Sequence, residues 1–150
     1  KEKLSKILKS KIRVLVDKYE GQSPLVGALT GFECVDAEYS LLLPCDTPFV
    51  SAAIVALLLD LCVNKSAVIP RWPNGYIEPL QAVYNTKSGV EAAKKALNEG
   101  KLNLLSMINH LRGVRYVSTS VLQQLDPKLL TFFNVNTRED LKRAEFMLRR

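Results

Sequence analysis

Histidine and cysteine are scarce in this sequence, which holds one histidine, His110, and three cysteines among 150 residues. Cys34, Cys45 and Cys62 are odd in number and form no Cys-x-x-Cys pair, so the sequence indicates neither a zinc site nor a disulfide framework. We expect these thiols to be buried apolar residues in a reducing cytoplasm. A Cys–His nucleophile pair would have to use His110, which lies in a helical pattern and is expected to be structural.

Long apolar runs are also absent. The best candidate, residues 49–63, is shorter than the roughly 20 residues of a membrane-spanning helix and contains Ser51 and Asp60. The Walker phosphate loop and the Rossmann glycine fingerprint are missing as well. With 47% hydrophobic and 24% charged residues, the composition predicts one compact domain over residues 1–150, with no membrane association.

The formal net charge is +6, and much of the excess lies in residues 1–11 and near the other end of the chain. Solvated helix faces explain this pattern, and a positive protein also suits polyphosphate ligands. A nucleic-acid-binding domain is a distant alternative, which predicts Lys and Arg clustered on one face and salt-sensitive binding. We therefore expect no nucleic-acid partner.

Helical and strand patterns alternate along the chain. Helical spacing or capping residues predict helices at residues 3–9, 24–32, 51–62, 87–99 and 104–111, and a last helix after Thr137. Short apolar runs predict strands at residues 12–16, 39–43, 66–69, 80–84, 114–117 and 132–135. This order predicts an α/β fold with a doubly wound, mainly parallel sheet and helices on both faces.

Polar residues follow several predicted strands. Asp17 follows residues 12–16, Asp46 follows residues 39–43, and Asn134 and Asn136 lie around the last strand. Open parallel sheets bind ligands beyond the carboxyl ends of their strands. Asp46, with prolines two residues before and two after it, suits a Mg²⁺ ion, which often takes one or two carboxylates plus phosphate oxygens. An ordinary turn aspartate bonded to its own backbone explains the pattern equally well.

Gly27 and the two asparagines are ambiguous. Gly27 falls early in a predicted helix, where glycine costs about 1 kcal/mol relative to alanine. Packing of the helix against the sheet is the favoured explanation, and close approach of a ligand is the alternative. Asn134 and Asn136 are either a strand end running into a capped helix or amides that face a ligand.

Several motifs resemble those of the molybdenum cofactor guanylyltransferases, in the nucleotidyltransferase superfamily. Residues 23–27, Ser-Pro-Leu-Val-Gly, are similar to that family's Gly-Pro-Leu-x-Gly. Residues 43–49, Leu-Pro-Cys-Asp-Thr-Pro-Phe, fit its Pro-Cys-Asp-x-Pro motif. Residues 133–141, Phe-Asn-Val-Asn-Thr-Arg-Glu-Asp-Leu, are similar to its Asn-x-Asn-Thr ending, and residues 75–84 resemble a segment found in many relatives. The motifs come in the family's order and span nearly the whole chain.

The resemblance implies a reaction in which the terminal phosphate of molybdopterin, with or without molybdenum, attacks the α-phosphorus of GTP and releases pyrophosphate. Such a phosphate is already ionised at neutral pH, so the chemistry needs no histidine base. Other proteins of molybdenum cofactor biosynthesis would be partners. The alternatives are another small-molecule nucleotidyltransferase, such as 2-phospholactate guanylyltransferase, and a non-catalytic nucleotide-binding domain.

The same resemblance implies roles for individual residues. Asp46 would hold Mg²⁺ against the triphosphate. The guanine nucleotide would be bordered by Asp17, Pro24, Leu25 and Gly27. The molybdopterin side would be formed by Glu78, Asn134 and Asn136.

One departure from the family is large. Its glycine-rich nucleotide loop, with basic residues, follows a first strand and has no counterpart here. The chain begins at Lys1, inside a helical pattern. We expect residues 1–150 to be an N-terminally truncated nucleotidyltransferase domain that is inactive alone.

Overall fold

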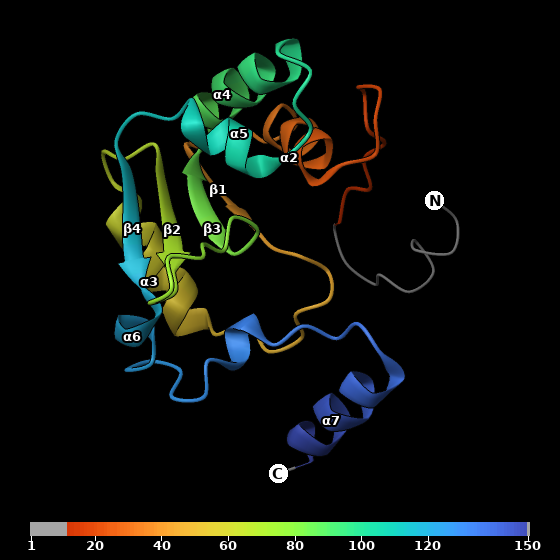
Figure 1. The fold of residues 1–150 in the computed structure, drawn as a ribbon, viewed down its shortest axis with the longest axis vertical. Coiled ribbons are helices and arrows are strands. Elements are labelled where there is room, and N and C mark those ends of the chain that lie inside the picture. Colours follow the sequence, from red (N-terminus) through yellow and green to blue (C-terminus); the bar gives the residue numbers. More distant parts are fainter. Residues whose placement is uncertain (1–11, 150) are drawn as a thin grey trace.

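The computed structural model describes residues 12–149. In this part of the chain four strands form one sheet in the order β1-β3-β2-β4 (Figure 1). The strands are β1 Tyr39–Leu42, β2 Ala67–Arg71, β3 Ala82–Asn85 and β4 Val114–Ser118. β3 runs antiparallel to both β1 and β2, whereas β2 and β4 are parallel. The helix predicted at residues 3–9 lies outside the described residues.

The predicted α/β fold with helices on both faces of the sheet is confirmed, and the sheet itself is mixed. β1, β2 and β4 run in one direction and β3 alone runs against them. Residues 72–81, which join β2 to β3, contain no helix. Because a parallel connection needs a crossover of a dozen or more residues, usually helical, this short link favours an antiparallel pair. That the chain forms a single domain stays a prediction.

Three helices cover one face of the sheet: α2 Pro24–Phe32, α4 Thr86–Asn98 and α5 Leu104–Asn109. They pack on the alternate strand residues Ala67, Ile69, Ala82 and Tyr84, all fully buried. The Phe32 and Tyr84 rings meet edge to face with centroids 5.7 Å apart. Period-two alternation along the strands directs these side chains to this face.

The opposite face is covered by α3 Ala52–Cys62 and the short α6 Thr119–Leu122. The intervening strand residues Val68, Val83 and Val117 point to this side and pack with Leu58 and Leu122. A 3₁₀ turn, η1 Leu130–Phe132, follows, and the chain reaches α7 Arg138–Leu148, which lies apart from the sheet in Figure 1. Among the described residues no helix is long and apolar enough to cross a bilayer.

The predicted helix caps are confirmed. Ser23 Oγ accepts the Val26 N–H at 3.2 Å, and Pro24 occupies the first turn. Ser51 caps α3. Thr137 and Asp140 form a reciprocal capping box at the start of α7. These side chains satisfy orphan N–H groups, which explains why the sequence placed these helix starts correctly.

The strand predicted at residues 12–16 is wrong. This segment is irregular, and the side chains of Ile12 and Val16 are 54% and 65% exposed. No described strand pairs with it, and an unpaired apolar run has no ladder to join. Asp17 is therefore not at a strand end.

The strand predicted at residues 132–135 is also wrong. The chain here forms η1 and then an irregular segment. The Phe132 N–H donates to the Leu129 carbonyl at 3.0 Å, and the Thr131 N–H donates to Asp126 Oδ2 at 2.8 Å. Because these local bonds satisfy the backbone, the apolar run does not extend the sheet.

Candidate functional site

The carboxyl ends of β1, β2 and β4 lie at one edge of the sheet, and β3 begins at the same edge. The loop between β1 and α3, residues 43–51, leaves this edge and carries Asp46. Asp46 lines a cavity of about 350 Å³ together with Cys45, Pro48, Val135 and the facing side of α7. Asp46 therefore lies in a cavity beyond the end of β1, and its role there stays a prediction.

One carboxylate oxygen of Asp46, Oδ1, receives no hydrogen bond from its own turn. Thr47 Oγ1 donates to the Pro44 carbonyl at 3.2 Å and closes the turn in its place. Asp46 Oδ1 is buried and accepts no hydrogen bond from the described residues. A turn aspartate would bond to its own backbone, so this alternative does not describe Asp46. Buried acceptors are nearly always satisfied, and an exception calls for a reason.

The segment that carries the two asparagines lies directly against this loop. The Val135 N–H donates to the Asp46 carbonyl at 2.8 Å. The Phe49 and Phe133 rings lie beside each other, with centroids 5.9 Å apart. Asn134 and Asn136 are exposed, so both amides remain accessible from solvent. The second and third sequence motifs, far apart along the chain, thus meet at one site.

Thr131 fixes this arrangement at the sheet edge. Its carbonyl accepts a hydrogen bond from Gln81 Nε2 at 2.7 Å, just before β3 begins. Its hydroxyl accepts the N–H of Ser51, the cap of α3, at 3.1 Å. Thr131 is buried, so these bonds form in a low-dielectric environment where leaving a group unpaired is costly. One residue therefore ties η1 to both the sheet and α3.

Glu78 braces the neighbouring turn. Trp72 Nε1–H donates to Glu78 Oε1 at 2.6 Å, and the Trp72 ring contacts Phe132 edge to face at 5.6 Å. Burial raises the pKa of the Glu78 carboxyl, and the Trp72 hydrogen bond opposes this shift. Glu78 thus lies near η1, where it supports the residues around it.

The residues predicted to border the nucleotide form a second group, on α2 and the segment before it. Pro24 and Gly27 are exposed at the start of the helix, whereas Leu25 is fully buried in the core. The Leu25 side chain is therefore unavailable to a ligand, and only its backbone could take part. A Cβ added at Gly27 would meet nothing within 4 Å, so the packing explanation for this glycine is wrong.

Asp17 is exposed next to Lys18, whose N–H donates to Thr30 Oγ1 of α2 at 3.5 Å. The structure therefore brings Asp17 near α2. Among the described residues no hydrogen bond or ion pair joins this group to Asp46. The nucleotide roles of Asp17, Pro24, Leu25 and Gly27 stay predictions.

The donor atoms around Asp46 suit a metal ion that takes few protein ligands. No cluster of three or more His, Cys, Asp or Glu side chains occurs in residues 12–149. A single carboxylate with an unpartnered buried oxygen suits Mg²⁺, which keeps several water or phosphate ligands. Glu145 of α7 lines the same cavity and was missed from sequence. Its helical spacing from Leu141 and Ala144 was the available signal.

The fold and this edge site define a class. A crystal structure of molybdopterin-guanine dinucleotide biosynthesis protein A from Archaeoglobus fulgidus matches 99% of this chain and 73% of that chain, with a TM-score of 0.80 and 27% identity. The chain thus has the fold of the α/β nucleotidyltransferases.

Sequence comparison identifies the family within the nucleotidyltransferases. The family described as MobA-like NTP transferase domain matches residues 1–114, and the chain belongs to this family. A probable molybdenum cofactor guanylyltransferase from Methanosarcina mazei is 38% identical over 146 residues, covering 95% of this chain and 65% of that protein. A molybdenum cofactor guanylyltransferase from Desulfosudis oleivorans is 33% identical over 130 residues, covering 86% of this chain and 63% of its own length. The chain thus spans slightly less than two thirds of these relatives.

Proposed function

We propose that the protein transfers GMP from GTP to the terminal phosphate of molybdopterin, with or without bound molybdenum, and releases pyrophosphate. The observation that carries this proposal is the unpartnered, buried Oδ1 of Asp46 at the carboxyl edge of the sheet. Membership of the MobA-like family and the names of its relatives support the choice of nucleotide and acceptor.

Asp46 is the residue that would hold a Mg²⁺ ion in this reaction. When bound, the ion neutralises charge on the triphosphate and helps to align it. The chain's own residues position the groups that would bind the two substrates. The turn closed by Thr47 leaves Asp46 Oδ1 without a hydrogen bond, and the Val135–Asp46 backbone bond holds the asparagine segment beside it.

The two substrates are proposed to approach from different elements. On the nucleotide side, the exposed start of α2, with no side chain at Gly27, gives a flat ring access to the backbone. Pro24, the Leu25 backbone and Asp17 would complete this side. On the acceptor side, Asn134 and Asn136 offer amide donors and acceptors, and Glu78 supports the nearby turn.

No general base is required by this proposal. The attacking phosphate is a dianion near neutral pH, so catalysis depends on alignment and charge neutralisation. This agrees with the residues around Asp46, which include no histidine. Three free cysteines in the described residues support a reducing, cytoplasmic setting for the reaction.

The test is a pyrophosphate-release assay on the full-length protein with Mg²⁺, one nucleoside triphosphate at a time, and molybdopterin. We expect release with GTP, none without molybdopterin, and loss of release when Mg²⁺ is chelated. A parallel reaction with 2-phospholactate as the acceptor separates the two guanylyltransferase activities. Release with 2-phospholactate but not with molybdopterin would overturn the proposed acceptor.

Asp46→Ala and Asp46→Asn test the proposed metal ligand. We expect either variant to lower kcat/KM at least 100-fold, because removal of a charge-stabilising group typically costs about 3 kcal/mol or more. Excess Mn²⁺ should partly restore Asp46→Asn, whose amide oxygen still binds a metal, and should not restore Asp46→Ala. Turnover close to that of the unaltered protein in Asp46→Ala would refute the role of this residue.

A further inference from the structure

β4 forms one edge of the sheet in the part of the chain that the structure describes (Figure 1). β2 pairs with it along Val114–Ser118, and no described strand lies on its other side. Alternate residues of β4 therefore direct their N–H and C=O groups away from the sheet. Outside the sheet, no backbone group of residues 12–149 forms a hydrogen bond with the backbone of residues 114–118. An unpaired edge of this kind is a template for a further strand.

The sequence around this edge carries no negative charge. Residues 61–77, which contain β2, and residues 100–125, which contain β4, include no Asp or Glu. Arg71, Arg112 and Arg115 lie in these two stretches, and none of the three forms an ion pair with a described acidic side chain. The other edge strand of the described sheet, β1, has acidic residues both before and after it in the sequence. The β4 edge is therefore the positive edge of the sheet.

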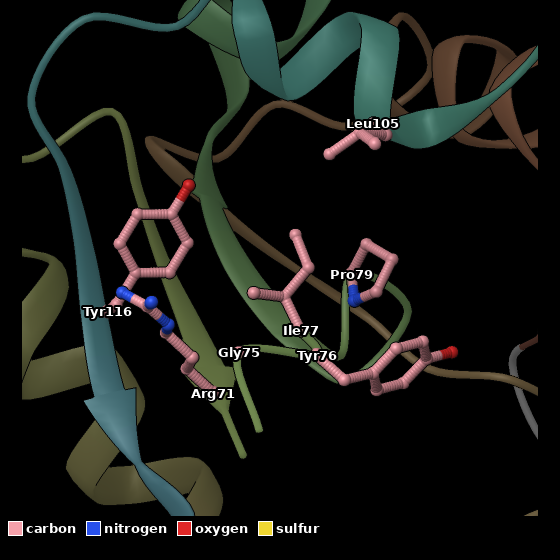
Figure 2. Close-up of a pocket in the computed structure, with 7 residues that line it drawn as sticks. All are labelled: Arg71, Gly75, Tyr76, Ile77, Pro79, Leu105 and Tyr116. Carbon is pink, nitrogen blue, oxygen red and sulfur yellow. The ribbon is translucent and has the colours of Figure 1, made fainter. Parts of the chain in front are cut away.

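An aromatic side chain accompanies this charge. Tyr116, in the middle of β4, is 45% exposed. The register pairs Arg71 of β2 with Ser118, so Arg71 and Tyr116 are diagonal neighbours on one face of the sheet. The Arg71 guanidinium lies over the Tyr116 ring, 5.7 Å from its centroid, and both side chains line a cavity of about 480 Å³ (Figure 2). Exposed Tyr and Arg side chains are the residue types that protein interfaces favour.

Arg115 brings positive charge to the other face of the same strand, because successive side chains of a strand alternate between faces. Its Nη1 donates to the Leu61 carbonyl at 3.1 Å, so the side chain is fixed while its charge has no anionic partner among the described residues. Arg112 lies two residues before β4 and is exposed. A segment beside β4 would thus meet cations on both faces and at the start of the strand.

We infer that the β4 edge docks an acidic, extended segment of a partner protein, which adds to the sheet as a further strand. The backbone of such a segment supplies both the donors and the acceptors that pair with the outward groups of β4. Its carboxylates neutralise the three arginines, and an apolar side chain between them packs on the Tyr116 ring. This surface goes beyond the proposed reaction and shares no residue with the cavity at Asp46.

Two other occupants match the edge less well. A second copy of the chain, paired through β4, would bring the arginines of both copies together, and like charges that face one another across a strand pair are destabilising. Nucleic acid matches the charge, but its phosphate oxygens only accept hydrogen bonds and would leave the outward C=O groups of β4 without donors. A peptide strand answers the charge and both kinds of backbone group.

The test is fluorescence anisotropy of the full-length protein with a labelled synthetic peptide in which Glu alternates with Val and Leu. We expect saturable binding that weakens as the salt concentration rises, because the charges are exposed. The same peptide with Lys in place of Glu should not bind. Two further peptides are N-methylated on alternate residues, one on the odd positions and one on the even. Only one of them should lose binding, since an added strand pairs with β4 through alternate N–H groups.

Variants of the protein locate the binding surface. Arg71→Ala and Arg112→Ala should each raise the peptide Kd about two- to fivefold, as expected for exposed charge pairs. Tyr116→Ser removes the ring and should raise the Kd about fivefold or more. Arg143→Ala, which removes an exposed arginine of α7, is the matched control for lost charge and should bind like the unaltered protein. Thermal unfolding of each variant shows whether a loss of binding reflects a loss of fold.

The inference is overturned if the acidic peptide does not bind, or if both N-methylated peptides bind as tightly as it does, because the edge would then attract charge without pairing. Unchanged binding in folded Arg71→Ala, Arg112→Ala and Tyr116→Ser would place the peptide elsewhere. A dimer in sedimentation that the peptide dissociates would assign the edge to a second copy. Tighter binding of a single-stranded oligonucleotide of equal charge, weakened by the same variants, would assign it to nucleic acid. The assay contains neither GTP nor molybdopterin, so its outcome is independent of the proposed reaction.

Discussion

Asp126 and Asp46 both lie near the carboxyl edge of the sheet, and their carboxylates differ in hydrogen bonding. Asp126 Oδ2 accepts the Thr131 N–H at 2.8 Å. Partial burial pushes the Asp126 pKa up, but bonds from Thr131 and neighbouring N–H groups outweigh this and lower the pKa overall. Asp46 Oδ1 is buried and receives no such bond. The Asp126 side chain therefore stabilises the fold through a hydrogen bond, whereas Oδ1 of Asp46 makes none.

Matched alanine variants separate the two roles. Asp126→Ala should lower the free energy of unfolding by about 1–2 kcal/mol, because the buried Thr131 N–H loses its acceptor. Asp46→Ala should change it by less than about 1 kcal/mol or raise it, because an unsatisfied buried oxygen is removed. Urea denaturation measures both values. A larger loss of stability in Asp46→Ala than in Asp126→Ala would mark Asp46 as structural.

At the scale of one element, α2 carries two glycines, one exposed and one half-buried. Gly27 is exposed near the start of the helix, and Gly31 lies one turn further on. A Cβ added at either position would meet nothing within 4 Å. Since neither glycine is required by packing, helix propensity alone would favour alanine at both positions.

Gly27→Ala and Gly31→Ala therefore form a matched pair. Each should stabilise the protein by about 0.5–1 kcal/mol in thermal or urea unfolding. If a nucleotide approaches the backbone at Gly27, only Gly27→Ala should raise the KM for GTP, by about tenfold, while Gly31→Ala leaves it unchanged. Equal KM values in both variants would remove Gly27 from the nucleotide site.

The elements also show which features can be read from sequence. The starts of α2, α3 and α7 were predictable because helix capping is a local interaction. Ser23, Ser51 and Thr137 cap N–H groups only three residues further along the chain. The strands predicted at residues 12–16 and 132–135 failed because an apolar run looks the same whether or not a neighbouring strand pairs with it. The direction of β3 also depends on non-local pairing, which local pattern does not carry.

The residues of the candidate site also divide into those that local sequence predicts and those that only the fold brings together. Asp46 was predictable because the flanking prolines and the motif of residues 43–49 lie within one short stretch of sequence. The cavity around Arg71 and Tyr116 was missed, because its walls come from separate elements that only the fold brings together. Glu145 was missed for the same reason.

At the scale of the whole molecule, one ionic network fastens the N-terminal described segment to the helical layer. Glu33 of α2 accepts the Tyr19 hydroxyl hydrogen bond at 2.8 Å and pairs with Lys94 of α4 at 2.8 Å and with Lys18 at 3.6 Å. The Lys94 and Tyr19 hydrogen bonds hold the pKa of the Glu33 carboxyl below its ordinary 4.5. The same Glu33 contact raises the pKa of Lys94.

The pH dependence of stability follows from these shifts. A carboxyl with a lowered pKa in the folded state contributes stability above its unfolded pKa, and that contribution is lost as the pH falls through the folded value. Unfolding midpoints measured from pH 7 down to pH 3 should therefore fall below about pH 4.5. Glu33→Gln should be less stable at pH 7 and should lose less on acidification. An identical acid profile in Glu33→Gln would exclude this network as a source of the pH dependence.

The bonds of Thr131 have a consequence for how the protein would fail. The buried residues of both cores come from the sheet and its covering helices, with Phe132 of η1 packed against one core, whereas Thr131 ties η1 to the sheet edge just before the asparagine segment that contacts the Asp46 loop. Loss of the Gln81 and Ser51 contacts would loosen η1 and, with it, the asparagine segment beside the Asp46 loop, at a smaller cost to the buried cores. Heating or a Thr131 substitution should accordingly abolish activity before the protein unfolds. A folded preparation would therefore not be evidence of an active enzyme.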